Sequence, residues 1–276
     1  MNKLSNEKRR AVVSCLVEGN SIRSTVRMTG VAKATVSKLV VDLGAACEKF
    51  HDATVRNVQS NRIECDEIWS FVGAKAKNVP ACKLGYWGDV WTWTAIDPES
   101  KLIVSYLVGG RDAGYASVFM NDVADRLANR VQLTTDGHKA YLSAVESAFG
   151  SNVDYTVLEK HYGTAPEGSA AVRYSPVKLQ SIEKHYVCGS PDPSLASTSI
   201  VERQNLTMRM SMRRFTRLTN GFSKKTENHA AAVSALYFMY YNFGRIHQTL
   251  RVTPAMEAGI SDHVWSIDEI VALLEV

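Results

Sequence analysis

Cysteine is scarce in this chain, and the cysteines that it has are scattered. Cys15, Cys47, Cys65, Cys82 and Cys188 are odd in number and include no C-x-x-C pair. A disulfide framework and a structural zinc site both need closely spaced thiols. We therefore expect reduced cysteines and no bound zinc.

Long hydrophobic runs are missing as well. No stretch approaches the roughly 18 consecutive apolar residues of a membrane span. The start, MNKLSNEKRR, is charged where a signal peptide has its apolar core. The overall mixture of 45% hydrophobic and 22% charged residues is typical of a globular protein and excludes a fibre or a disordered tail. These features predict a soluble, cytoplasmic protein without a membrane partner.

Acidic residues are absent from one basic segment and sparse in another. Residues 203–225 contain seven Lys and Arg and no acid, and residues 1–50 contain nine Lys and Arg against four acids. A single cluster of this kind could be a solvated helix face. Two clusters in one chain favour a polyanionic partner such as nucleic acid, because Lys and Arg neutralise its phosphates.

Helical patterns occupy residues 1–57. Ser5 and Ser21 are candidate N-caps of two helices, and a third helix begins near Ala32 after a Gly-containing turn. This pattern is typical of a helix-turn-helix, whose last helix enters the major groove, although any small three-helix bundle gives a similar one. We predict a DNA-binding domain at residues 1–57 that contacts DNA through Thr35, Ser37 and Lys38.

The pattern changes to strands rich in β-branched and aromatic residues from residue 60 onward. Three such strands are followed by alternating helices and strands, in the order β-β-β-α-β-α-β-α. This order is the ribonuclease H-like arrangement. We predict an α/β catalytic core at residues 58–276, with a mixed five-stranded sheet, an irregular insertion at about 160–197 and C-terminal helices.

Three carboxylates stand out in this predicted core. Asp66 lies inside the first strand, where aspartate is uncommon, and Asp136 directly follows the fourth strand. Glu202 lies on a later helix, with Arg209 two turns further along the same face. Carboxylates that converge from neighbouring strands and a helix would suit Mg²⁺, or Mn²⁺ in its place, and phosphodiester cleavage.

Each of the three acids also has a structural interpretation. Asp66 could belong to the solvated face of an edge strand, and Asp136 could form an ordinary Asp-Gly turn. Glu202 stands three residues after Ser199, which is the spacing of a capping box. The catalytic interpretation depends on the three acids meeting at one place.

Five stretches resemble the DDE transposase of the insertion sequence one family. The resemblance covers about residues 60–260, and its most specific part is the block around the helical glutamate. The stretches are ECDEIWSFVGAKAKNVP, GDVWTWTAID, LTTDGHKAY, STSIVERQNLTMRMSMRRFTRLTNGFSKK and YYNFGRIHQTLRVTPA.

The resemblance implies a bacterial mobile-element recombinase, acting at the nucleoid with a divalent metal. Asp66, Asp136 and Glu202 match its catalytic, metal-binding acids, and Arg209 matches the basic residue that follows the glutamate. Implied partners are the terminal repeats of the element, target DNA and further copies of the chain. The family's cysteine-rich zinc segment has no counterpart here. The residues expected to hold the DNA backbone are Arg203, Arg209, Arg213, Arg214, Lys224 and Lys225.

Two other functions remain open at this point. A regulator derived from a transposase would keep the helix-turn-helix and the core but would not cleave DNA. A simple ribonuclease H-like nuclease would need the metal site but not the N-terminal domain or the basic segment after Glu202.

Overall fold

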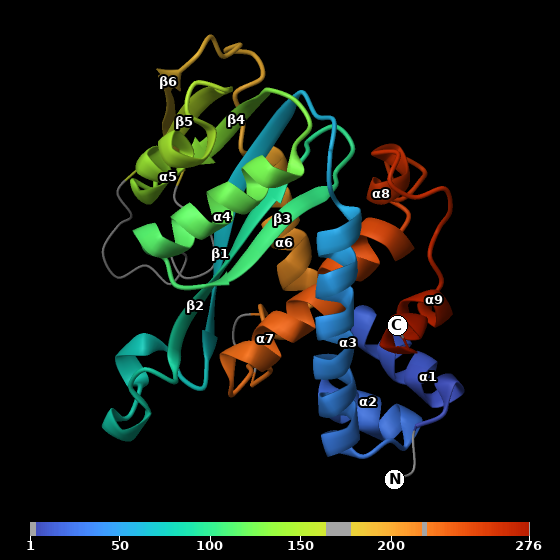
Figure 1. Ribbon diagram of the computed structural model, residues 1–276. Helices are drawn as coiled ribbons and strands as arrows, with labels where there is room; N and C mark the ends of the chain where they lie inside the picture. The colour runs from blue at the N-terminus through green and yellow to red at the C-terminus, as the bar shows by residue number, and fades with distance from the viewer. Residues whose placement is uncertain (1–3, 164–177, 217–219, 276) are drawn as a thin grey trace.

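A six-stranded mixed sheet forms the centre of the molecule in the computed structural model, which describes residues 4–163, 178–216 and 220–275 (Figure 1). The strand order is β3-β2-β1-β4-β5-β6. The first three strands are antiparallel neighbours, β4 and β5 continue the sheet in parallel, and β6 returns antiparallel to β5. This order is consistent with the predicted ribonuclease H-like arrangement. The strands are β1 (Arg62–Val72), β2 (Gly88–Ile96), β3 (Ile103–Gly109), β4 (Val131–Asp136), β5 (Val153–Tyr162) and β6 (Leu179–Cys188).

The sixth strand corrects the predicted five-stranded sheet and the irregular segment predicted at 160–197. β5 extends to Tyr162, and β6 pairs with it along Leu179–Cys188. Residues 164–177 of that segment lie outside the described residues. β6 lies at the edge of the sheet with nearly all its side chains exposed, so no alternation of apolar and polar residues marks it in the sequence.

Two helices, α4 (Ala113–Arg126) and α5 (Ala140–Phe149), pack against each other over one face of the sheet. The side chain of Asp112 caps α4 by accepting hydrogen bonds from the backbone N–H groups of Gly114 and Tyr115. Phe119 of α4 is fully buried and contacts the ring of Trp93 on β2. α6 (Ser199–Ser211) packs against β1 and β2 on the opposite face of the sheet.

The N-terminal segment forms three helices, α1 (Asn6–Val17), α2 (Ile22–Thr29) and α3 (Lys33–Thr54). The side chains of Ser5 and Ser21 accept hydrogen bonds from backbone N–H groups of α1 and α2, which confirms both predicted caps. Gly30 ends α2 in the left-handed conformation, with φ of 69°, that glycine adopts without strain. The predicted turn between the second and third helices is thereby confirmed.

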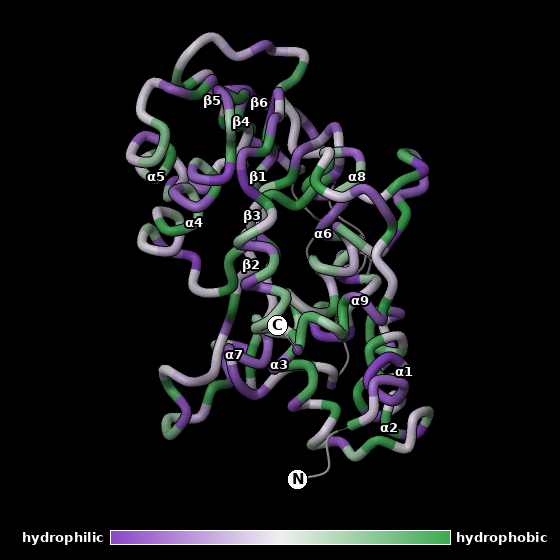
Figure 2. Tube along the Cα trace, turned by 45° about the vertical axis from the view of Figure 1, so that its right-hand side comes forward, coloured by the Kyte–Doolittle hydropathy of each residue, from purple (hydrophilic) through white to green (hydrophobic). Residues whose placement is uncertain are grey.

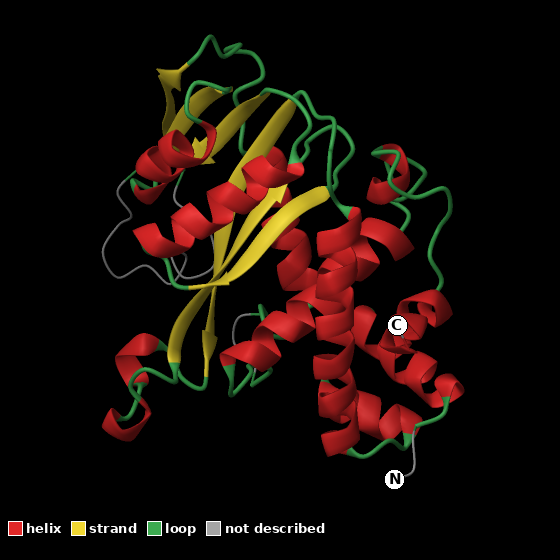
Figure 3. Cartoon of the chain, viewed as in Figure 1, coloured by secondary structure: helices red, strands yellow, loops and turns green. Residues whose placement is uncertain are grey.

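Helices from the end of the chain pack against these N-terminal helices. α7 and the π-helical turn η4 contact α3, and α9 contacts α1, with an ion pair of 3.0 Å between Arg10 and Asp268. Figure 3 shows these helices gathered to one side of the sheet, with both chain ends among them. The predicted boundary at residues 57/58 falls between α3 and β1. The C-terminal helices are α7 (Thr226–Ala232), η4 (Val233–Phe238), η5 (Tyr240–Gly244), α8 (Pro254–Glu257), α9 (Ile267–Ala272) and η6 (Leu273–Glu275). Two short 3-10 turns, η1 (Ala76–Asn78) and η2 (Ala81–Lys83), lie between β1 and β2.

Buried side chains of the sheet and of the helices beside it form one hydrophobic core. The core includes Leu43 of α3, Ile63 and Ile68 of β1, Trp93 of β2 and Phe238 of η4, each almost fully buried. Within the described residues no helix is both long and apolar enough to span a membrane, and Figure 2 shows hydrophobic and hydrophilic residues interleaved along α1–α3. A continuous core holds the helical part and the sheet together.

Candidate active site

Two adjacent acids, Asp66 and Glu67, lie in the middle of β1, the strand between β2 and β4. Because side chains alternate along a strand, they leave β1 on opposite faces. The backbone N–H of Glu67 donates a 2.8 Å hydrogen bond to Oδ1 of Asp66. β1 is a central strand, on which Asp66 is half-buried and Glu67 is buried. The alternative interpretation of Asp66, as part of the solvated face of an edge strand, is therefore wrong.

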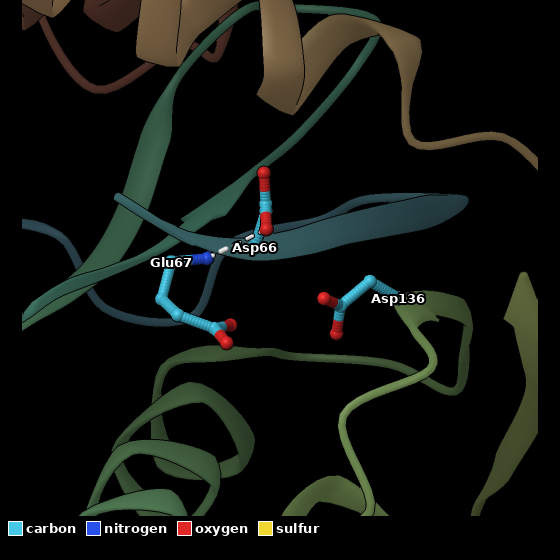
Figure 4. A group of neighbouring side chains, drawn as sticks. All are labelled: Asp66, Glu67 and Asp136. Carbon is cyan, nitrogen blue, oxygen red and sulfur yellow. Dashed lines mark hydrogen bonds between the residues drawn. The ribbon is translucent and has the colours of Figure 1, made fainter. Parts of the chain in front are cut away.

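Asp136 ends β4, directly beyond the point where this strand stops pairing with β1. The last pair is Cys65 with Thr135, so Asp136 follows next to Asp66. Figure 4 shows the side chain of Asp136 pointing from the strand end toward the two acids of β1. Oxygen atoms of Asp66, Glu67 and Asp136 lie within 4.8 Å of one another. The Asp-Gly turn thus places a carboxylate at the site as well as reversing the chain.

The three carboxylates destabilise each other's charge. Burial, together with the neighbouring charges of Asp136 and Glu67, raises the pKa of Asp66 to about 7. Burial and Asp136 also raise the pKa of Glu67. A divalent cation would relieve this repulsion, and carboxylate oxygens are the ligands that Mg²⁺ and Mn²⁺ prefer. The donor set therefore fits the predicted metal.

Glu67 already has two partners of its own. Its Oε1 accepts a hydrogen bond from Arg111 Nε, and its Oε2 accepts one of 2.9 Å from the hydroxyl of Tyr141. Arg111 also approaches Asp136, with 3.7 Å between Nη2 and Oδ2, and its guanidinium lies 4.7 Å from the centre of the Trp91 ring. Both oxygens of Glu67 therefore already have side-chain partners, and one of these partners, Arg111, is a cation that balances its charge.

Glu202 lines the same pocket of about 780 Å³ as Asp66 and Asp136. It lies on the first turn of α6, and its Oε1 accepts hydrogen bonds from Lys160 of β5 and from the Thr198 hydroxyl. The N-cap residue of α6 is Thr198, whose own side chain accepts no hydrogen bond from the first turn of the helix. The capping-box interpretation of Ser199 and Glu202 is therefore wrong, because the helix begins at Ser199 instead of after it.

Two further side chains fix the position of β1 relative to α6. The Asn205 amide of α6 donates a 2.7 Å hydrogen bond to Oδ2 of Asp66. Glu64 of β1 accepts hydrogen bonds of 2.8 and 3.0 Å from the N–H groups of Ile200 and Val201, the first turn of α6. The buried Glu64 carboxylate thus caps the helix that carries Glu202.

Sequence analysis did not identify four side chains that complete the site: Glu67, Arg111, Lys160 and Asn205. Glu67 carried a signal, because it is a second acid inside the strand of Asp66. Asn205 follows Glu202 by three residues and so shares its helix face. Arg111 and Lys160 carried no signal, because only the sheet topology brings them to the pocket.

The residues predicted to bind DNA lie in two regions. Thr35 and Lys38 are exposed on α3, and Lys38 forms an ion pair of 2.6 Å with Asp42. Ser37 lies on the same helix and is half-buried. The remaining residues come from α6 and the segment after it: Arg203, Lys224 and Lys225 are exposed, as is Arg213, while Arg209 and Arg214 are half-buried. Of these residues, Ser37, Arg213, Arg214 and Lys224 line a groove between α2–α3 and residues that follow α6. Thr35 and Lys38 line a different pocket, between α3 and the last residues of the described chain.

No protein-family model matches the chain, and no curated protein matches it either. Among solved structures, the chain is similar to a piggyBac transposase in a synaptic complex with hairpin DNA, studied by cryo-EM. The similarity has a TM-score of 0.40 and 12% identity, and it covers 99% of this chain and 72% of that chain. The functional argument therefore depends on the side chains described above.

Proposed function

We propose that the chain is a DDE-type DNA transposase, as its resemblance to the insertion sequence one family implies. The observation that carries the proposal is the acidic pocket, in which Asp66, Asp136 and Glu202 meet from β1, β4 and α6. Two aspartates on adjacent parallel strands, with oxygens within 4.8 Å, form a binding site of the kind that Mg²⁺ needs.

Asp66 and Asp136 are the proposed metal ligands, and Glu202 completes the set from the helix. Bound Mg²⁺ would supply activation of the attacking oxygen and stabilisation of the leaving oxygen. Asn205 holds the Asp66 carboxylate in place, and Arg111 holds Glu67 against the strand. Lys160 pairs with Glu202 and is a proposed contact for the phosphate of the scissile strand.

The DNA would reach this pocket along basic surfaces that flank it. The proposed contacts are the N-terminal helices at residues 1–57, for the terminal repeat, and the basic segment after Glu202 for the backbone. Joining two element ends needs two sites, so we propose that a dimer or larger assembly forms on DNA.

Cleavage and joining of DNA test this proposal directly. The substrates are labelled duplexes taken from the two sequences that flank the gene, incubated with Mg²⁺ or Mn²⁺. Compared are the wild type, Asp66→Asn, Glu202→Gln and the control Glu146→Gln, an exposed acid on α5 away from the pocket. We expect the wild type and the control to cleave and join, and the two pocket variants to bind DNA without reacting.

Other outcomes separate the alternatives. Binding by all four proteins with no reaction would contradict catalysis and favour the regulator. Cleavage without joining would favour the simple nuclease. Equal reaction by the wild type and Glu202→Gln would contradict the role of Glu202.

A further inference from the structure

A second groove, remote from the acidic pocket, separates the N-terminal helices from the segment that follows α6. Its volume is about 590 Å³, and its walls include residues of α2 and α3 on one side and residues 212–214, 220–224, 228 and 236 on the other. Among the described residues that line it, none is acidic. Its cations are Arg23, Lys33, Arg213, Arg214 and Lys224.

Arg214 is the least exposed of these cations, since it is half-buried and the other four are exposed. Its Nε donates a 2.8 Å hydrogen bond to the hydroxyl of Ser223, and within the described part of the chain its two terminal nitrogens have no protein acceptor. Burial lowers its pKa to about 10, and no carboxylate counteracts this effect. A desolvated guanidinium without an anionic partner is costly for a folded protein, so it indicates a site that an anion completes.

The N-terminus of α3 faces the same groove. Ala32 occupies the N-cap position, and no side chain accepts a hydrogen bond there. The first turn of α3 also contains no acid, and Lys33 and Ser37 of this helix line the groove. The N–H groups and the positive end of the helix dipole therefore add to the field of the five cations.

We propose that this groove binds phosphate groups of a DNA backbone between α3 and the segment after α6. A phosphate there would accept hydrogen bonds from Arg214 and from the first turn of α3, while Lys33 and Lys224 would neutralise charge at the rim. The choice of DNA over a small phosphate anion rests on the proposed function.

DNA in the groove would connect two parts of the chain that are distant in sequence. Residues between 20 and 41 line one wall, and residues 212–214 and 220–224 line the other, so one stretch of DNA backbone would contact both. The recognition helix would then be held in a fixed position relative to α6, which carries Glu202. The groove would thus set the distance between the bound DNA end and the acidic pocket.

Equilibrium binding of a duplex of arbitrary sequence tests the proposal, with EDTA present to prevent chemistry. A fluorescein-labelled duplex is titrated at several salt concentrations with the full chain, with Lys33→Gln/Lys224→Gln, and with the control Lys77→Gln/Lys83→Gln, whose residues lie between β1 and β2. The control removes two exposed cations outside the groove. Arg214→Gln is a further variant, used only if circular dichroism shows that it folds.

We expect the groove variant to bind the duplex about tenfold more weakly than the wild type. The plot of log K against log salt should also become less steep by about 2, because each lost phosphate contact reduces the slope by roughly 0.9. The control keeps a larger slope. Equal affinities and slopes for the groove variant and the control would overturn the proposal. It would also fail if the groove variant lost binding of inorganic pyrophosphate but bound the duplex normally, because the groove would then take a small anion.

The two proposals can fail separately. If the wild type does not cleave DNA with Mg²⁺ but the groove variant shows the expected change in salt slope, only the proposal for the acidic pocket fails. If the wild type cleaves DNA but the groove variant keeps the salt slope of the wild type, only the proposal for the groove fails.

Discussion

Asp66 receives a hydrogen bond from one side chain, the amide of Asn205. This bond orients Oδ2 and favours the charged form of a carboxylate whose pKa is raised to about 7 by burial and by the neighbouring acids Asp136 and Glu67. We expect Asn205→Ala to weaken Mn²⁺ binding by about tenfold, the lower end of the usual effect of residues that orient a metal ligand. Isothermal titration of the full chain with Mn²⁺ measures it.

The matched control for this change is Asn121→Ala on the exposed side of α4. Its amide bonds only within its own helix, so Mn²⁺ affinity should not change. Equal affinities for the two variants would mean that the Asn205 amide does not support a metal ligand.

At the level of single residues, the sequence predicts the aspartates better than their partners. Asp66 was identifiable because an acid inside a strand is unusual, and Asp136 because it ends a strand. Arg111 and Lys160 are ordinary surface residues in the sequence. They become part of the pocket only because β4 and β5 follow β1 in the sheet and α4 begins beside β3.

At the level of elements, the position of α6 depends on Glu64. Its carboxylate accepts two backbone N–H groups of the first turn, and in Glu64→Ala these buried donors have no acceptor. We expect the free energy of unfolding to fall by about 2 kcal/mol, the size of a strong helix cap and a lost charged hydrogen bond. Urea denaturation measures the change, and a loss no larger than that of the exposed Glu146→Ala would contradict the capping role.

The contact between α3 and α7 depends on a residue without a side chain. A Cβ added at Gly44 would lie 2.6 Å from the Cα and carbonyl oxygen of Ala231, which are backbone atoms and cannot rotate away. We expect Gly44→Ala to lower the free energy of unfolding by about 2 kcal/mol through overpacking, although alanine favours a helix by about 1 kcal/mol. Thermal denaturation that shows a stabilised variant would contradict this close packing.

The sequence predicted helices and strands that bury one face, but it did not predict a strand whose two faces are both exposed. The caps of α1 and α2 were correct because Ser5 and Ser21 act on their own helices. β6 was missed because backbone hydrogen bonds to β5 hold it in place and its side chains contribute little burial. The sequence of such an edge strand carries no pattern of period two.

At the level of the whole molecule, two buried histidines join the helices to the sheet. His51 of α3 lies 3.3 Å from the carbonyl of Ile103 on β3, and His229 of α7 lies 3.1 Å from the hydroxyl of Ser70 on β1. Burial lowers the pKa of His51 to about 4 and that of His229 to about 3. A nearby arginine adds to the effect in both cases.

Acid should therefore weaken this contact. Below pH 6.5 the unfolded chain takes up protons that the two folded histidines do not, so stability falls as the pH decreases toward 4. Each histidine contributes roughly 1.4 kcal/mol per pH unit over this range. We expect His51→Gln/His229→Gln to lose less stability than the wild type between pH 6.5 and 5 in urea denaturation. Parallel pH profiles would contradict this origin of the acid sensitivity.

The packing of the last helices on the first ones has a consequence for the order of events during synthesis. α1 and α3 are translated well before α9 and α7, the helices that they pack against. The N-terminal helices must therefore wait with an apolar face uncovered while the sheet forms. In a nascent chain the N-terminal helices therefore gain their packing partners only after every strand of the sheet and the helix that carries Glu202 have been made.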